Sequence, residues 1–248
     1  DYKSAVGKTW EEGVSVGMTY GTDPVDATKD NVKLFMSDDK SRVYLLAPEG
    51  GRVVFPENCT HLFSNFPKLT SLSLSHQVTV GATITHNYPD THLVKNMSCM
   101  FYNVPELLKL DLSGFDTSGV ENMSLMFRGT SSTGVEISKL NSLTLGDGFD
   151  TSRVTDMSQM FYQTGLKTLN LKKFDTSSVT SMYSMFGEAV NLTSLDLGSF
   201  DTSSVTSMNS MFNYTISLTD LNVGSFDTSS VTDMSRMFSE WLALPTLD

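Results

Sequence analysis

The sequence lacks the features that mark several large classes of protein. Its 248 residues include two cysteines, so no disulfide framework holds the fold together. No run of 18 apolar residues occurs, which argues against a transmembrane helix. The chain has neither an initiating Met nor a signal-peptide pattern, and we expect that it starts at an internal point of a longer product.

Positive charge and catalytic motifs are also scarce. Lys and Arg number 17 against 28 Asp and Glu, which gives a formal net charge of −11, and the basic residues form no cluster. Such a surface repels phosphate backbones and anionic lipids, so we expect no nucleic-acid partner and no membrane insertion. The sequence contains no G-x-S-x-G, H-E-x-x-H or P-loop motif. We therefore predict a protein that is not an enzyme and has no cofactor.

A repeat dominates what is present. The tetrapeptide F-D-T-S and the phrase M-x-x-M-F recur, mostly 25 or 26 residues apart and once 34 apart. F-D-T-S starts at Phe115, Phe149, Phe174, Phe200 and Phe226, and M-x-x-M-F starts at Met97, Met123, Met157, Met182, Met208 and Met234. A full unit reads L-x-x-L-x-L-x-x-F-D-T-S-x-V-x-x-M-x-x-M-F, followed by a short variable segment.

The periodicity inside the unit indicates its local structure. L-x-x-L-x-L is typical of a short strand, F-D-T-S of a turn, and apolar residues at i, i+3 and i+4 in M-x-x-M-F of one helical turn. A single unit buries too little to fold alone, so neighbouring units must merge their cores. The clearest unit predicts these inward side chains: Leu192, Leu195, Leu197, Phe200, Val205, Met208, Met211 and Phe212.

The sequence therefore predicts an α/β repeat solenoid, a right-handed coil with a short parallel β-strand and a helical turn per unit. We divide the chain into an N-terminal β-rich cap or subdomain (1–41) and a solenoid of about seven coils (42–248), which breaks off inside an eighth. Two insertions, within 78–95 and 128–139, interrupt the array. Loops that leave a rigid array are common places for binding surfaces.

The segment LTSLDLGS followed by FDTSSVTSMNSMF resembles the repeat of roughly 26 residues found in BspA-like leucine-rich-repeat bacterial surface proteins. The resemblance covers about residues 43–248. It implies a leucine-rich-repeat-like fold, an extracellular location on a Gram-positive or mycoplasma-type cell surface, and a role in adhesion. Family units often carry Cys shortly after M-F, whereas this chain has other residues there.

A ladder of aspartates follows from the repeat: Asp116, Asp150, Asp175, Asp201 and Asp227. We interpret these residues as structural, with each carboxylate accepting a hydrogen bond within its turn. Calcium bound between units is the alternative, although one carboxylate per unit is few for an ion that prefers six to eight oxygens. We assign no metal site.

Aromatic residues gather within and after M-x-x-M-F: Tyr102, Tyr162, Tyr183, Tyr214 and Trp241. One interpretation is a ridge that contacts a ligand, and the other is a cover for the edges of the units. His61, His76, His86 and His92 cluster loosely but match no closed zinc pattern. We expect free thiols at Cys59, which fills a core Met position, and at Cys99.

These observations favour a cell-surface, adhesin-like binding module that recognises a protein or glycan of a host or neighbouring cell. The alternative is a passive structural spacer that displays other domains. A third hypothesis places an enzyme or metal site around residues 76–99.

Overall fold

The computed structural model describes residues 14–15, 19–20, 33–36, 41–46, 53–74, 76–80, 83–129 and 138–241. Every regular element among them is a short strand. The strands are β1 (Val14–Ser15), β2 (Thr19–Tyr20), β3 (Lys33–Met36), β4 (Arg42–Leu46), β5 (Val53–Val54), β6 (Ser71–Ser73), β7 (His76–Val80), β8 (Thr83–Asn87), β9 (Lys109–Leu112), β10 (Ser142–Leu145), β11 (Ser194–Asp196) and β12 (Asp220–Asn222).

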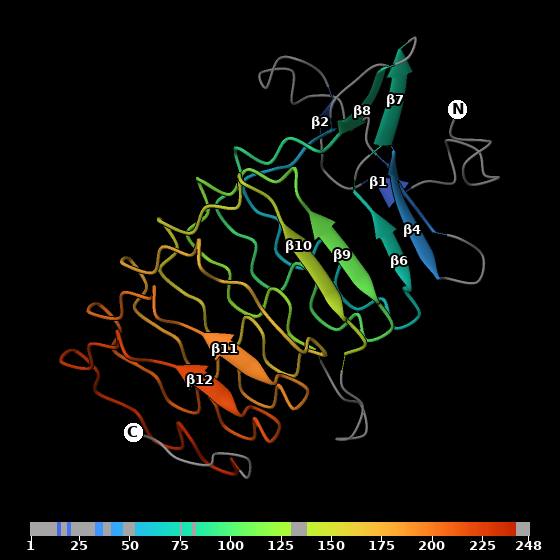
Figure 1. Ribbon diagram of the computed structural model, residues 1–248. Helices are drawn as coiled ribbons and strands as arrows, with labels where there is room; N and C mark the ends of the chain where they lie inside the picture. Colours follow the sequence, from blue (N-terminus) through green and yellow to red (C-terminus); the bar gives the residue numbers. More distant parts are fainter. Residues whose placement is uncertain are drawn as a thin grey trace.

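The strands form small sheets. The largest has the order β1-β3-β4-β6, in which β3 is antiparallel to β1 and β4, and β4 is parallel to β6. Four pairs complete the set: β2–β5 and the hairpin β7–β8 are antiparallel, and β9–β10 and β11–β12 are parallel. In Figure 1, β4, β6, β9, β10, β11 and β12 follow one another along one face, from the N-terminal to the C-terminal end. We call this side the leucine face, because each of its repeats contributes the L-x-x-L-x-L residues.

The M-x-x-M-F segments lie side by side along a second edge, which we call the Met/Phe edge. Parallel bridges join the residues that precede each segment, in the order Asn58, Asn96, Asn122, Asp156, Ser181, Ser207 and Asp233. The phenylalanines stack with ring centroids 5.4 to 5.9 Å apart: Phe63, Phe101, Phe127, Phe161, Phe186, Phe212 and Phe238. Each repeat thus contacts the repeats before and after it.

The predicted α/β class and the leucine-rich-repeat-like solenoid with a helical turn per unit are wrong. No helix occurs in the described residues, and the strands are short and belong to small separate sheets. M-x-x-M instead forms a turn: the Met100 N–H donates to the Met97 carbonyl, and Cys99 has a φ of 55°. Positive φ at the third of four residues is the pattern of a type II turn, and a right-handed helix cannot continue through it.

Alternate backbone N–H groups of these turns donate hydrogen bonds to the next repeat rather than within their own repeat. The N–H groups of Met97, Cys99 and Phe101 donate to carbonyls of the next repeat at 2.9–3.0 Å. Inter-repeat bonding therefore replaces the helical hydrogen bonds that the i, i+3, i+4 spacing predicts.

The predicted inward side chains are confirmed. All eight residues of the clearest unit are at most 2% exposed, and they form one continuous core with the buried counterparts of other units. The threonine of F-D-T-S is buried in four copies, at Thr117, Thr151, Thr176 and Thr202, and its hydroxyl donates to the backbone carbonyl of the next repeat's aspartate, for example from Thr176 to Asp201 at 2.8 Å. The domain boundary at residue 41 stays a prediction; β1, β2 and β3 lie before it.

Candidate functional site

The leucine face is interrupted in the middle of the molecule. β10 pairs with β9 on one side, and Thr168 of the next repeat bridges to Ser194 of β11 on its far side. Within residues 138–241 no backbone hydrogen bond joins β10 to residues 166–171. Two strand edges therefore face each other without pairing. A hydrogen-bonded ladder is also missing between β6 and β9.

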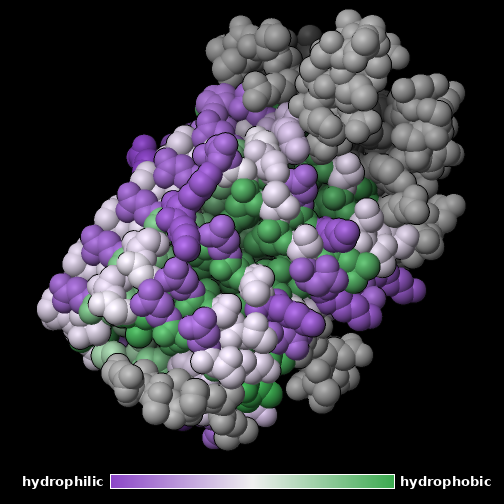
Figure 2. All heavy atoms as spheres, viewed as in Figure 1, coloured by the Kyte–Doolittle hydropathy of each residue, from purple (hydrophilic) through white to green (hydrophobic). Residues whose placement is uncertain are grey.

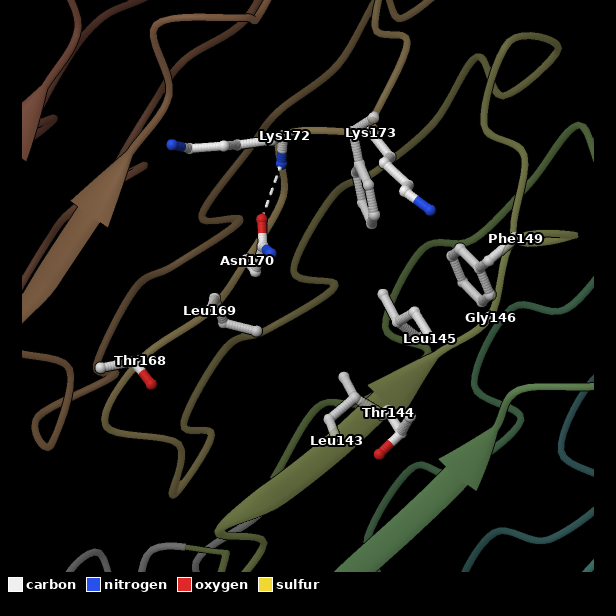
Figure 3. A pocket seen from close by; sticks show the side chains of 11 residues that line it. Leu143, Thr144, Leu145, Gly146, Phe149, Thr168, Leu169, Asn170, Lys172 and Lys173 are labelled. Carbon is white, nitrogen blue, oxygen red and sulfur yellow. Dashed lines mark hydrogen bonds between the residues drawn. The ribbon is translucent and has the colours of Figure 1, made fainter.

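A cleft of about 420 Å³ occupies this interruption. We call it the leucine cleft; its lining comprises Leu143, Thr144, Leu145, Gly146, Phe149, Thr168, Leu169, Asn170, Lys172, Lys173 and Phe174. Figure 3 shows the leucines of the two facing repeats directed toward the space between them. In Figure 2, apolar side chains reach the surface in this region, with hydrophilic residues around them.

The cleft leaves leucines exposed that are buried elsewhere. Leu143, Leu145 and Leu169 are only partly buried, whereas their counterparts Leu110 and Leu195 are 2% exposed. Apolar surface in contact with water is unfavourable. The repeats around the cleft therefore keep apolar area available that other repeats bury against a neighbour.

Two small length changes flank the cleft. Three residues, Gly146 to Gly148, separate the last leucine of β10 from Phe149, whereas other units have two residues there. The segment from Phe161 to Leu166 is one residue shorter than its counterparts from Phe186 to Leu192. A Cβ at Gly146 would lie 1.9 Å from the Ser113 carbonyl oxygen, so the longer turn packs directly on the preceding repeat. This close approach lies on the β9 side of β10.

The other edges remain closed at the level of the cleft. Phe161 stacks on Phe186 at 5.8 Å, and Phe149 stacks on Phe174 at 5.9 Å. The Gln159 N–H donates to the Tyr183 carbonyl at 2.8 Å. The repeats are thus bonded on two sides and separated on the third.

Lysines stand at one end of the cleft. Lys173 forms an ion pair with Asp147 across the cleft, and this hydrogen bond holds the pKa of the Asp147 carboxyl below its usual value. Lys172 points the other way in Figure 3, and its Nζ lies 3.5 Å from Asp196 of β11. Both pairs are well exposed, so each contributes little to stability.

The predicted ligand-contacting aromatic residues do not form one ridge. Tyr102 and Tyr162 flank the Arg128 guanidinium, which lies 5.8 Å and 4.8 Å from their ring centroids. Tyr183 and Tyr214 are exposed at 42% and 45% and belong to other turn positions. Trp241 packs on Phe212 and Phe238, and its indole N–H donates to the Leu218 carbonyl. The structure brings Tyr102 and Tyr162 together through Arg128, and Tyr183 lies near enough to Tyr162 to raise its pKa. The role of the five aromatic residues in binding stays a prediction.

The Tyr–Arg–Tyr stack is tied into the fold by polar contacts. Arg128 donates to Gln159 at 2.7 Å, and the Tyr162 hydroxyl donates to the Glu188 carboxylate. Burial, followed by this hydrogen bond, raises the pKa of the Tyr162 hydroxyl. Tyr162 is therefore neutral at physiological pH and acts as a donor.

The aspartate ladder makes turn hydrogen bonds. Each carboxylate accepts from the backbone N–H of the serine two residues on, at 2.8–3.0 Å: Asp116, Asp150, Asp175, Asp201 and Asp227. In the described ranges no three His, Cys, Asp or Glu side chains gather where they could share a metal ion. The ladder lies outside the leucine cleft.

Histidines and cysteines are dispersed where the structure describes them. His61 contacts Ser64, and His92 contacts Asp90 at 2.6 Å. The side chains of His76 and His86 lie outside the described part. Both thiols are free; Cys59 is buried, and burial raises its pKa to about 12. Burial also raises the pKa of Cys99.

Sequence reasoning missed the residues of the leucine cleft. Leu143, Leu145 and Leu169 fit the repeat perfectly and were expected to lie in the core. The available signal was the irregular spacing of F-D-T-S, 34 and then 25 residues, on either side of Phe149.

A family model described as "Mycoplasma protein of unknown function, DUF285" matches residues 70–165 and 144–245. The two matches span most of the chain, and the protein belongs to this family. No curated protein and no solved structure matches the chain. No membrane-crossing helix is found among the residues that the structure describes.

Proposed function

We propose that the protein is a non-enzymatic binding module of a cell surface, adhesin-like, and related in function to the BspA-like proteins that its repeats resemble. The observation that carries this proposal is the leucine cleft. It combines partly exposed leucines, exposed hydroxyl and amide side chains at Thr144, Thr168 and Asn170, and a lysine pair at one end. Binding sites commonly pair an apolar lining with a few polar groups in this way.

Recognition of a protein or glycoprotein fits this site better than catalysis does. The cleft lining contains no carboxylate, histidine or cysteine that could act as an acid, a base or a nucleophile. The partner we propose is a surface protein or glycan of a host or neighbouring cell, and the location is extracellular.

A passive spacer is the second candidate, and the uninterrupted Met/Phe edge favours it. Repeats that bond continuously make a stiff support. A spacer, however, has no use for leucines exposed between two repeats.

Binding of the labelled 248-residue chain to cultured cell surfaces and to arrays of immobilised glycans and extracellular proteins tests the proposal. The variant Thr144→Arg/Asn170→Arg fills the cleft from two exposed positions, and we expect it to lose at least tenfold in affinity. The control Ser71→Arg/Thr219→Arg changes exposed positions elsewhere on the same face and retains binding. If the unaltered chain binds no target, the spacer is correct; if the cleft variant binds as well as the control, recognition lies elsewhere.

A further inference from the structure

We propose that the leucine cleft receives an extended, acidic peptide segment of the partner protein as an added β-strand between β10 and residues 168–171. This inference rests on the proposed function and names the form in which the partner binds. In this mode of binding, the two free backbone edges form hydrogen bonds with the inserted segment.

Two backbone edges, β10 and residues 168–171, border the leucine cleft. β10 is paired through Ser142↔Lys109 to Leu145↔Leu112 on its β9 side, and Thr168 is bridged on its β11 side. The edges that face the cleft have no backbone partner among residues 138–241. Unpaired strand edges are templates for another strand, and addition of an extended peptide to such an edge is a common mode of recognition. In the leucine cleft, β10 and residues 168–171 offer two such edges to one inserted peptide segment.

Apolar and polar side chains alternate along both edges of the cleft. Along β10, partly buried Leu143 and Leu145 alternate with exposed Thr144, and on the opposite side Leu169 lies between exposed Thr168 and Asn170. An added strand directs alternate side chains to the same face, so apolar residues at every second position would meet these leucines. The neighbouring strand β11 already places Leu195 this way, 2% exposed, between exposed or half-buried polar residues.

Lysines are concentrated in one wall of the cleft. The repeat that forms one wall carries Lys167, Lys172 and Lys173, whereas the sequence after it contains one basic residue, Arg236. Lys172 already contacts a carboxylate of the adjacent strand, Asp196. Lys173 reaches across the end of the cleft to Asp147, where it would meet an acidic residue of an inserted strand. Because that pair is exposed, an incoming carboxylate can compete with Asp147.

A synthetic peptide tests strand addition. The probe is blocked LTSLDLGS, the sequence of residues 192–199, in which leucines alternate with polar residues and one aspartate. Titration into the isotope-labelled 248-residue chain is followed by backbone amide NMR. We expect saturable shifts confined to residues 142–145 and 168–171, with a dissociation constant on the order of 100 μM.

Altered peptides separate backbone pairing from side-chain contact. Two N-methylated versions, modified at alternate residues, keep every side chain but remove donors on one edge or the other. We expect each to bind at least tenfold more weakly. Binding of both versions as tightly as the unmodified peptide, or shifts confined to another edge such as β12, would overturn strand addition.

Protein variants test the charge. We expect Lys173→Glu to weaken binding about tenfold and Asp147→Asn to strengthen it about two- to threefold, because the lysine is then free. Lys68→Glu is the matched control, since this exposed lysine lies outside the cleft lining, and it should change affinity less than twofold. If Lys173→Glu and Lys68→Glu have the same effect, the acidic preference is wrong.

The two proposals fail in different ways. If cell-surface binding depends on the cleft but the peptide does not bind, strand addition is wrong and the binding function stands. If the chain binds neither cells nor peptide, both proposals are wrong.

Discussion

The Met/Phe edge and the leucine face are built from the same repeats, yet they respond differently to a change in repeat length. At the Met/Phe edge, the repeats on either side of the cleft stay bonded, for example from the Phe161 N–H to the Met185 carbonyl at 2.9 Å. On the leucine face, one added residue next to Phe149 and one missing residue after Phe161 accompany an open cleft.

The difference follows from how each side is bonded. The Met/Phe edge combines ring stacking with alternate backbone hydrogen bonds, so each repeat is held at several points. The leucine face relies on strands of three or four residues, and β10 pairs with β9 but not with the repeat after it. The Met/Phe edge therefore stays bonded at the level where the leucine face opens into the cleft.

The largest expected effect comes from a substitution in the Met/Phe edge. Phe161 is fully buried between Phe127 and Phe186 at the level of the cleft. We expect Phe161→Ala to lower the free energy of unfolding by about 3–5 kcal/mol, because it leaves a cavity in the aromatic stack. Urea denaturation measures it, and Tyr183→Ala at an exposed site should change stability by less than about 0.5 kcal/mol. A loss below about 1 kcal/mol for Phe161→Ala would contradict the stabilising role of this edge.

A smaller effect compares two equivalent leucines. Leu195 is buried in a paired strand and Leu169 lines the cleft. We expect Leu195→Ala to cost about 2–5 kcal/mol and Leu169→Ala about 1–2 kcal/mol, because Leu169 is already partly in water and its removal only enlarges an existing space. The same denaturation measurement decides. Equal losses would mean that the cleft is closed in solution.

The smallest effect concerns the aspartate turns, which run along the whole array. Hydrogen bonds from the following serine lower the folded-state pKa of Asp175, Asp201 and Asp227. A depressed pKa stabilises the fold above the unfolded-state value of about 3.9, and this contribution is lost as pH falls through the folded value. We expect the thermal midpoint to be flat from about pH 7 to 5 and to fall below about pH 4. Scanning calorimetry with Ser203→Ala, which removes one such bond, should show a shallower fall.

The sequence predicted the core better than the backbone. Apolar residues at i, i+3 and i+4 correctly placed Met208, Met211 and Phe212 inside, because a type II turn can bring the same three positions inward as a helical turn does. The difference lies in left-handed residues such as Leu125 and Gln159, at φ 57°. Neither is Gly or Asn, the residue types that most often adopt a positive φ, so their identity did not indicate a turn. Inter-repeat hydrogen bonds select that conformation, and they exist only once the repeats are assembled.

The cleft was beyond sequence reasoning for a similar reason. The spacing of F-D-T-S revealed an irregularity near Phe149 but not its direction. Whether an added residue bulges outward or separates two strands depends on what the turn touches, here the backbone of Ser113.

The column of phenylalanine rings also bears on how such proteins diversify. Within the column, each ring stacks on the one before and the one after it, at nearly constant spacing. Duplicating or deleting one whole unit by recombination would bring together two rings that already match. Related genes could therefore lengthen or shorten their products by one repeat at a time and keep the same ring contacts, which here span 5.4 to 5.9 Å per repeat.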